Sequence, residues 1–253
     1  MMSRIPRLLL FDIDGTLTTS AHTVGKGGSS LLKALSVAFD RNIERNGVVF
    51  SGGTDPSITK DVLIANGITS DNSQNYAHCI SKAFEMLPGV VKTGIADGSY
   101  CWKSLPKVNE LLQVLSKRKD VKLALLTGNL QATALLKLKS AQIDVDLFKL
   151  ENTDELFGAF GSDPHDQRSD LVTVAKARYS EFLGHKNITP NDMIVIGDSP
   201  KDIECAHANN VPCLAVATGM FKTDQLQTAD CVLENFQNVD ETVRAIVETI
   251  RKI

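Results

Sequence analysis

The sequence has 253 residues, enough for one large domain or for a main domain with a smaller insert. Hydrophobic residues make up 43% of it and charged residues 23%, the balance of a globular protein that buries a sizeable core. The net charge of −3 argues against nucleic acid or an anionic membrane as a partner, because either would need a basic surface. An anionic substrate would therefore have to be held by local positive groups.

The five cysteines predict reduced thiols and a cytoplasmic location. Their number is odd and none forms a C-x-x-C pair, so a secreted disulfide framework is not expected. Near the N-terminus, the apolar run of residues 8–11 stops at Asp12, so it is too short for a signal-peptide core or a membrane span.

The first predicted element is a buried strand over residues 7–13, which ends in the carboxylates Asp12 and Asp14 and the turn residue Gly15. Residues i and i+2 of an extended chain face the same way, so the two carboxylates would lie close together. Like charges at that separation need a cation or a proton between them. The alternative is an ordinary polar turn, for which Asp-Gly is a common dipeptide.

A helical insert is predicted over residues 19–103, where strand signals are few. Helices are expected at 31–39, 56–65 and 76–87, flexible connections at 25–30 and 51–54, and a linker with turns at 88–102. Thr54 and Asp55 could face the site and contact the substrate, or could simply cap the second of these helices. Tyr100 and Trp102 are expected to pack in the linker.

After the insert, the pattern predicts a helix at 105–118, a strand at 121–126 and a helix at 130–139. Thr127, Gly128 and Asn129 join the last two. A hydroxyl group and free backbone N–H groups at a helix N-terminus form an anion site. The alternative is an ordinary helix cap.

Arg168 precedes a predicted helix at 171–182. A fixed cation there, facing Asp12, would hold a phosphoryl group and offset the repulsion between carboxylates. The alternative is a surface arginine paired with Asp166 or Asp170. The competing cations are Lys176, Arg178 and Lys186.

The next strand is predicted at 193–196 and the next helix at 201–209. Asp198 lies between these two elements, and Asp202 lies in the first turn of the helix. Carboxylate oxygens suit Mg²⁺, a hard cation that takes few protein ligands. Ser199 before Pro200 is also good chemistry for a helix start, so we expect capping and metal binding to coexist here.

Strands at 214–217 and 231–233 and an amphipathic helix at 239–250 complete the chain. Strands that alternate with helices predict an α/β fold with a Rossmann-like parallel sheet and helices on both faces. The core domain would then comprise residues 1–18 and 104–253, and the helical insert residues 19–103.

In this order, Asp-x-Asp-Gly-Thr, a strand followed by Thr-Gly-Asn, a cation and Gly-Asp-x-x-x-Asp, the sequence resembles the haloacid dehalogenase superfamily. The resemblance covers nearly the whole chain. The insert stands where members carry a helical cap domain, directly after the first motif. Residues 158–163 and 216–219 resemble the phosphoglycolate-phosphatase-like branch.

The resemblance implies a magnesium-dependent phosphatase that cleaves a small-molecule phosphate monoester through an aspartyl-phosphate. Asp12 would be the nucleophile and Asp14 the general acid and then the general base. The implied phosphate-binding residues are Thr127, Gly128, Asn129 and Arg168, with Arg168 where lysine is usual. The implied Mg²⁺ ligands are Asp12, Asp14 (through its backbone carbonyl), Asp198 and Asp202.

Two alternatives stay open. A sugar phosphomutase shares these core residues and differs in how the cap excludes water, and a non-catalytic phosphate-binding or regulatory protein could retain the fold. The expected partner is a small phosphorylated metabolite, because a helical cap that closes over the site would exclude a folded protein surface.

Overall fold

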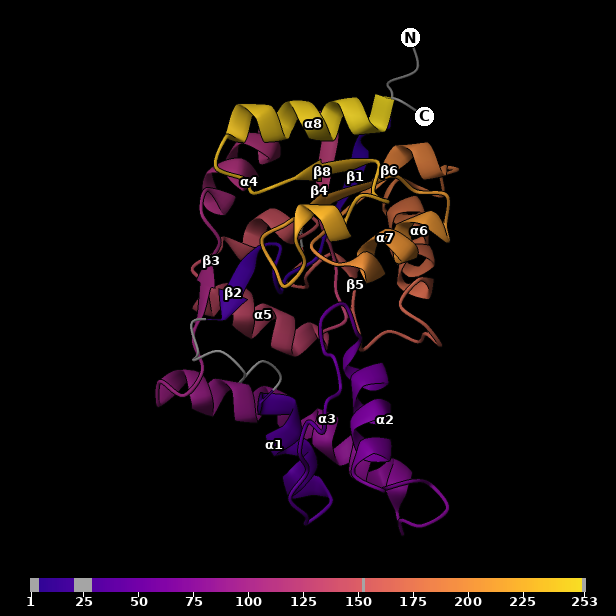
Figure 1. The fold of residues 1–253 in the computed structure, drawn as a ribbon. Coiled ribbons are helices and arrows are strands. Elements are labelled where there is room, and N and C mark those ends of the chain that lie inside the picture. The colour runs from indigo at the N-terminus through magenta and orange to yellow at the C-terminus, as the bar shows by residue number, and fades with distance from the viewer. Residues whose placement is uncertain (1–4, 21–28, 152, 252–253) are drawn as a thin grey trace.

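The central feature of the protein is a six-stranded parallel sheet (Figure 1). The computed structural model describes residues 5–20, 29–151 and 153–251. Across the sheet the order of strands is β5-β4-β1-β6-β7-β8. Their bounds are β1 Arg7–Phe11, β4 Val121–Leu126, β5 Gly158–Ala159, β6 Met193–Gly197, β7 Cys213–Val216 and β8 Cys231–Leu233. The α/β fold expected from the sequence is therefore confirmed.

Helices cover both faces of the sheet, and the alternating side chains of β1 show how. Leu9 and Phe11 belong to the apolar cluster that includes α4 (Val108–Ser116) and α8 (Val239–Arg251). Leu8 and Leu10 belong to the cluster on the other face, with α6 (Asp170–Phe182) and α7 (Pro200–His207). Because both faces of β1 are buried, its sequence is a continuous apolar run.

The helical insert leaves and re-enters the core through a short antiparallel ribbon, β2 (Thr18–Ser20) paired with β3 (Trp102–Ser104). Between these strands lie α1 (Ser29–Ala38), α2 (Asp55–Ala65) and α3 (Tyr76–Ala96), which extend from one end of the core in Figure 1. The expected boundaries at residues 18–19 and 103–104 fall within the ribbon, and the division into domains stays a prediction. The connection expected at 25–30 lies outside the described residues up to residue 28, and α1 begins at Ser29.

The prediction of a linker at 88–102 is wrong for residues 88–96, because α3 continues through Pro88 to Ala96. Leu87 and Val91 are buried in the main apolar cluster, so tertiary packing outweighs the poor helix propensity of Pro88 and Gly89. Gly94 lets the chain fold back on this helix. The Tyr100 N–H donates to the Gly94 carbonyl over 2.8 Å, and a Cβ at residue 94 would overlap the Tyr100 ring.

The short elements were also missed. Strand β5 has two residues, and β2 and β3 have three each, too few for a periodic signal. Helix α5 (Gln131–Ser140), by contrast, lies where a helix was expected at 130–139. Of the two connections expected to be flexible, residues 51–54 form an ordered loop that ends in a capping box, where Thr54 caps α2. Within the described residues, no helix combines the length and apolar character needed to cross a membrane.

Gly89 and Gly94 provide a matched test of the continued helix. We expect Gly89→Ala to raise the free energy of unfolding by about 0.5–1 kcal/mol, because alanine is the better helix former and its Cβ would meet open space. Gly94→Ala should lower it by roughly 1–3 kcal/mol, because the added Cβ overlaps the Tyr100 ring. Chemical denaturation followed by circular dichroism measures both. Equal effects at the two positions would contradict the continued helix and its contact with Tyr100.

Candidate active site

The polar residues of the predicted motifs meet at one edge of the sheet. Phe11 at the end of β1 is in register with Leu125 of β4 and Ile196 of β6, so these strands end together. Asp12 follows β1, and Asp198 follows β6. In an open parallel sheet, this carboxyl edge is where ligands bind.

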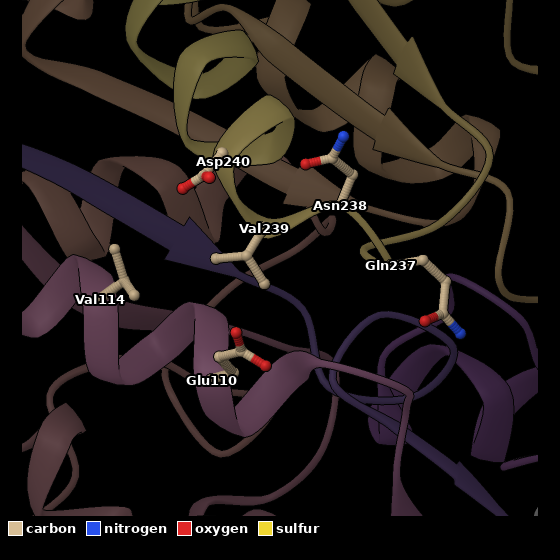
Figure 2. A pocket seen from close by; sticks show the side chains of 6 residues that line it. All are labelled: Glu110, Val114, Gln237, Asn238, Val239 and Asp240. Atoms are coloured by element: carbon tan, nitrogen blue, oxygen red, sulfur yellow. The ribbon is translucent and has the colours of Figure 1, made fainter.

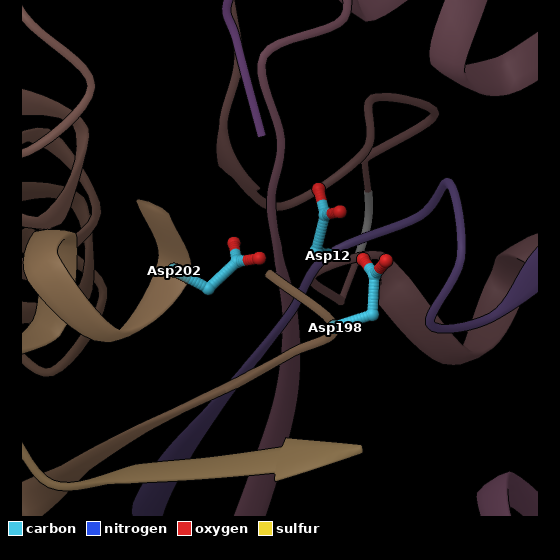
Figure 3. Close-up of side chains that lie close together, drawn as sticks. All are labelled: Asp12, Asp198 and Asp202. Carbon is cyan, nitrogen blue, oxygen red and sulfur yellow. The ribbon is translucent and has the colours of Figure 1, made fainter. Parts of the chain in front are cut away.

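Three buried carboxylates form a cluster at this edge, and Figure 3 shows them converging. Asp12, Asp198 and Asp202 each offer an oxygen within 4.8 Å of the others. Their exposed fractions are 5%, 2% and 1%, so water does little to screen their charges. A set of buried carboxylate oxygens is the kind of ligand that a hard divalent cation takes.

The pKa values of Asp12 and Asp198 are raised by the burial of this negative charge. Burial raises the pKa of Asp12 to about 7, although the positive charge of Arg168 opposes the rise. Burial, reinforced by the charges of Asp202 and Asp12, raises the pKa of Asp198 to about 9. The protonated form of Asp198 is therefore favoured at neutral pH, and a bound cation would take the place of its proton.

Glycine allows the backbone to wrap closely around Asp198. A Cβ at Gly15, where φ is +90°, or at Gly219 would overlap the Asp198 carboxylate. The hydroxyl of Thr218 donates to the Gly15 carbonyl over 2.6 Å, which ties the loop after β7 to the turn after Asp14. The loop after β7, which contains Thr218 and Gly219, therefore lines the site beside Asp198.

Arg168 supplies the positive charge of the cluster. Its guanidinium donates to Asp202 Oδ1 over 2.6 Å and lies 3.1 Å from Asp12 Oδ1, with 9% of the side chain exposed. Arg168 is therefore not the surface arginine of the alternative interpretation. Arg178, which was a competing candidate for the cation of the site, pairs with Asp163 instead. Among the described residues, Arg168 Nε is a buried donor without a hydrogen-bond partner. Its role toward phosphate stays a prediction.

The loop after β4 brings a hydroxyl group and an amide side chain to the site. Thr127 is fully buried, and its Oγ1 accepts from Asn129 Nδ2 over 2.8 Å. The cap position of α5 is Leu130, which has no side-chain cap of its own. Its N–H instead donates to Asp55 Oδ2 of the helical insert over 2.9 Å. The alternative in which this loop caps its own helix is therefore not observed.

Asp14 departs from the expected arrangement. Because β1 ends at Phe11, strict alternation does not extend to residue 14, and the Asp14 carboxylate is not part of the cluster. Its Oδ2 lies 2.5 Å from Lys137 Nζ and accepts from Asn129 Nδ2 over 2.8 Å. Partial desolvation raises the pKa of the half-exposed Asp14 carboxyl, but the charge of Lys137 and hydrogen bonds from Lys137, Asn129 and Trp102 outweigh this and hold the pKa below its usual value.

The loop of residues 50–55 in the helical insert closes over this edge. The Asp55 N–H donates to the Gly128 carbonyl over 2.7 Å, and Arg168 donates to the Gly52 carbonyl over 3.2 Å. A Cβ at Gly128 would overlap the backbone of Gly53. Burial raises the pKa of Asp55 to about 6, although Lys137 opposes the rise.

His165 adds a contact between the core and this loop. Its Nδ1 lies 2.7 Å from the Asp163 carbonyl, which can only accept, so Nδ1 is assigned the hydrogen. In the neutral ring, Nε2 then accepts from the Thr54 hydroxyl over 3.0 Å. Together these contacts join the core to the loop of residues 50–55.

Sequence reasoning missed Lys137 and assigned Trp102 to packing alone. Lys137 lies within α5, whereas Asn129 precedes that helix, so no helical spacing relates the two residues. A lysine in this helix carries little signal, because lysines are common on solvent-exposed helix faces.

A separate hollow of about 390 Å³ lies between α4 and the start of α8 (Figure 2). Glu110 and Val114 line one side and residues 237–240 the other. None of the predicted site residues belongs to it, so the candidate site is the strand edge alone.

Comparison with known proteins agrees with this site. Residues 9–216 match the family model described as haloacid dehalogenase-like hydrolase. A protein of Photorhabdus laumondii named phosphoglycolate phosphatase is 22% identical over 244 residues, which cover 94% of this chain and 92% of that protein.

Solved structures share the fold. A hydrolase from Pseudomonas syringae has a TM-score of 0.61 at 19% identity, with 95% of this chain and 99% of that one covered. A β-phosphoglucomutase from Clostridium difficile has a TM-score of 0.58 at 15% identity, with 98% of each chain covered.

The resemblance expected from the motifs is confirmed, including its phosphoglycolate-phosphatase-like branch. The family model spans well over half of the sequence and contains the loops that carry Asp12, Thr127, Arg168 and Asp198. The chain therefore belongs to the haloacid dehalogenase-like hydrolases.

Proposed function

We propose that this hydrolase is a magnesium-dependent phosphatase that cleaves a small phosphate monoester through an aspartyl-phosphate on Asp12. The observation that carries the proposal is the buried group of Asp12, Asp198, Asp202 and Arg168. It combines a carboxylate nucleophile, a cation for phosphate and a carboxylate set for a metal. The name of the Photorhabdus relative, phosphoglycolate phosphatase, supports the reaction class.

Arg168 and the loop after β4 would bind the phosphoryl group. The unpartnered Nε of Arg168 has no acceptor among the described residues, and a phosphate oxygen would supply one. The Thr127 hydroxyl and the backbone of Gly128 and Asn129 would contact the other oxygens at the start of α5.

Asp12 would attack phosphorus in line, so that a bond from Asp12 to phosphorus forms as the bond to the ester oxygen breaks. Asp14 in its protonated form would give a proton to the leaving alcohol, whereas the lowered pKa of its carboxyl favours the charged form, which would act as the base in the second step. Asp14 would then take a proton from the incoming water, whose oxygen displaces Asp12 and releases inorganic phosphate. The covalent intermediate divides one difficult displacement into two easier ones.

Asp12, Asp198 and the backbone carbonyl of Asp14 would hold Mg²⁺. When bound, the ion would neutralise charge on the phosphate oxygens in the transition state. Asp202 would act at the rim of this set, because Oδ1 accepts from Arg168 and Oδ2 from the Ser199 N–H and hydroxyl. Its capping box with Ser199 would thereby orient Arg168.

The substrate would be small, because the loop of residues 50–55 meets the core through backbone contacts at Gly52 and Gly53. That closure also keeps a sugar phosphomutase as the second candidate, since a mutase must shield its phospho-enzyme from water. A product assay separates the two: a mutase returns an isomer and no free phosphate. A purely binding role is disfavoured, because it would not require a buried nucleophile beside a cation.

We also propose a cytoplasmic location. Cys79, Cys205, Cys213 and Cys231 carry free thiols, and reduced thiols persist in the cytoplasm.

Phosphate release from a panel of small phosphate esters tests the reaction. We expect release to require Mg²⁺, Asp12→Asn to abolish it, and Asp14→Asn to slow it by about 10²–10⁴-fold through loss of general acid–base catalysis. Asp71→Asn, an equal change of charge at an exposed position of the insert, serves as the control. Wild-type turnover by Asp12→Asn would end the proposal.

Thermal unfolding with and without Mg²⁺ tests the metal site. The raised pKa values of Asp12 and Asp198 mean that the folded protein binds protons that the unfolded chain has lost, so this pair's contribution to stability falls as pH rises from about 4 to 9. Mg²⁺ competes with those protons. We therefore expect Mg²⁺ to raise the midpoint of unfolding more at about pH 8 than at about pH 5.5. Asp198→Asn should lose the effect, and an undiminished shift in that variant would place the ion elsewhere.

A further inference from the structure

Lys137 is a nearly buried cation that lies outside the family motifs. Its side chain is 13% exposed, and Nζ lies 2.5 Å from Asp14 Oδ2 and 2.6 Å from Asn129 Oδ1. The ammonium group also lies 5.5 Å from the centre of the Trp102 ring. Lys139, two residues further along α5, is exposed, so this helix can keep a lysine in water. The side chain of Lys137 is instead largely buried against Asp14 and Asn129.

The side chains of Asp14, Asn129 and Lys137 all contact one another. Lys137 donates to both Asp14 and Asn129, and Asn129 Nδ2 donates to Asp14 Oδ2 over 2.8 Å. The same Nδ2 donates to Thr127 Oγ1 over 2.8 Å. A carboxylate whose side chain is 44% exposed, on a turn beyond the end of β1, would otherwise sample several rotamers. These contacts fix it beside the loop proposed to bind phosphate.

The insert completes the surroundings of Lys137. Trp102 comes from β3, the strand on which the chain returns from the insert, and its ring lies under the ammonium group. Asp55 comes from the start of α2 and also interacts with Lys137 electrostatically. The position of Lys137 therefore depends on contacts from both the core and the insert.

We infer that Lys137 is a positioning residue for Asp14: it holds the carboxylate beside Asn129 and Thr127, where the carboxylate takes the proton of the water that hydrolyses the aspartyl-phosphate. The inference rests on the proposed function. Lys137 itself forms no bond to the substrate, and the proton passes only from water to Asp14. Loss of the ammonium group frees Asp14, so hydrolysis of the phospho-enzyme slows while its formation from an activated ester does not.

p-Nitrophenyl phosphate isolates this step, because nitrophenolate leaves without a proton. The variants are Lys137→Met, which removes the charge but keeps the length, Lys137→Arg, and the matched control Lys139→Met. The decay of radiolabelled phospho-enzyme is followed by rapid quench in full-length protein. We expect Lys137→Met to slow decay by about 10-fold or more, with kcat/KM changed by less than about 3-fold, because kcat/KM reports formation of the phospho-enzyme, which needs the phosphate contacts and not the general base. Lys139→Met should match the wild type, and Lys137→Arg should lie between.

A purely structural lysine gives a different result. Lys137→Met would then lower the midpoint of thermal unfolding while phospho-enzyme decay per active site stayed at the wild-type rate, and that outcome overturns the inference. If Lys137→Met does not fold, Lys137→Gln replaces it, since glutamine also removes the charge, and a decay rate equal to the wild type in that variant overturns the inference. Failure of the proposed function is distinguishable, because no phospho-enzyme would then form in the wild type.

Discussion

The concentration of negative charge at the carboxyl edge of the sheet is the constraint on which the rest of the site depends. Parallel strands bring Asp12 and Asp198 to one place, and the first turn of α7 adds Asp202. Burial of three carboxylates is costly unless positive charge accompanies them. Arg168 supplies part of that charge, and the raised pKa values of Asp12 and Asp198 are consistent with negative charge that a bound cation would neutralise.

Asp12 and Asp14 illustrate how neighbouring carboxylates acquire different properties. They are two residues apart, yet Asp12 pairs with Arg168 and Asp14 with Lys137. Burial raises the pKa of one, whereas the charge of Lys137 holds the pKa of the other below its usual value. The lowered pKa of Asp14 favours a charged carboxylate that can accept a proton from water, whereas Asp12 needs added positive charge nearby to be fully ionised.

The helical insert is joined to this chemistry by backbone contacts more than by long side chains. Gly52, Gly53 and Gly128 allow the loop of residues 50–55 to touch the core closely, and Asp55 caps α5 across the interface. Trp102 extends the same junction to Lys137. The loop of residues 50–55 and the Asp14 carboxylate therefore share Lys137 as a neighbour.

The sequence by itself determined the parallel sheet, because strands buried on both faces must be continuous apolar runs, and it identified Asp12, Asp198 and Thr127 at their ends. It did not determine that α3 runs through Pro88, since packing of Leu87 and Val91 outweighs local propensity there. Nor did it assign Lys137, whose role depends on a contact with Asp14 across 123 positions of the chain. Local pattern encodes burial and strand ends, whereas the pairing of distant charges exists only once the elements have packed.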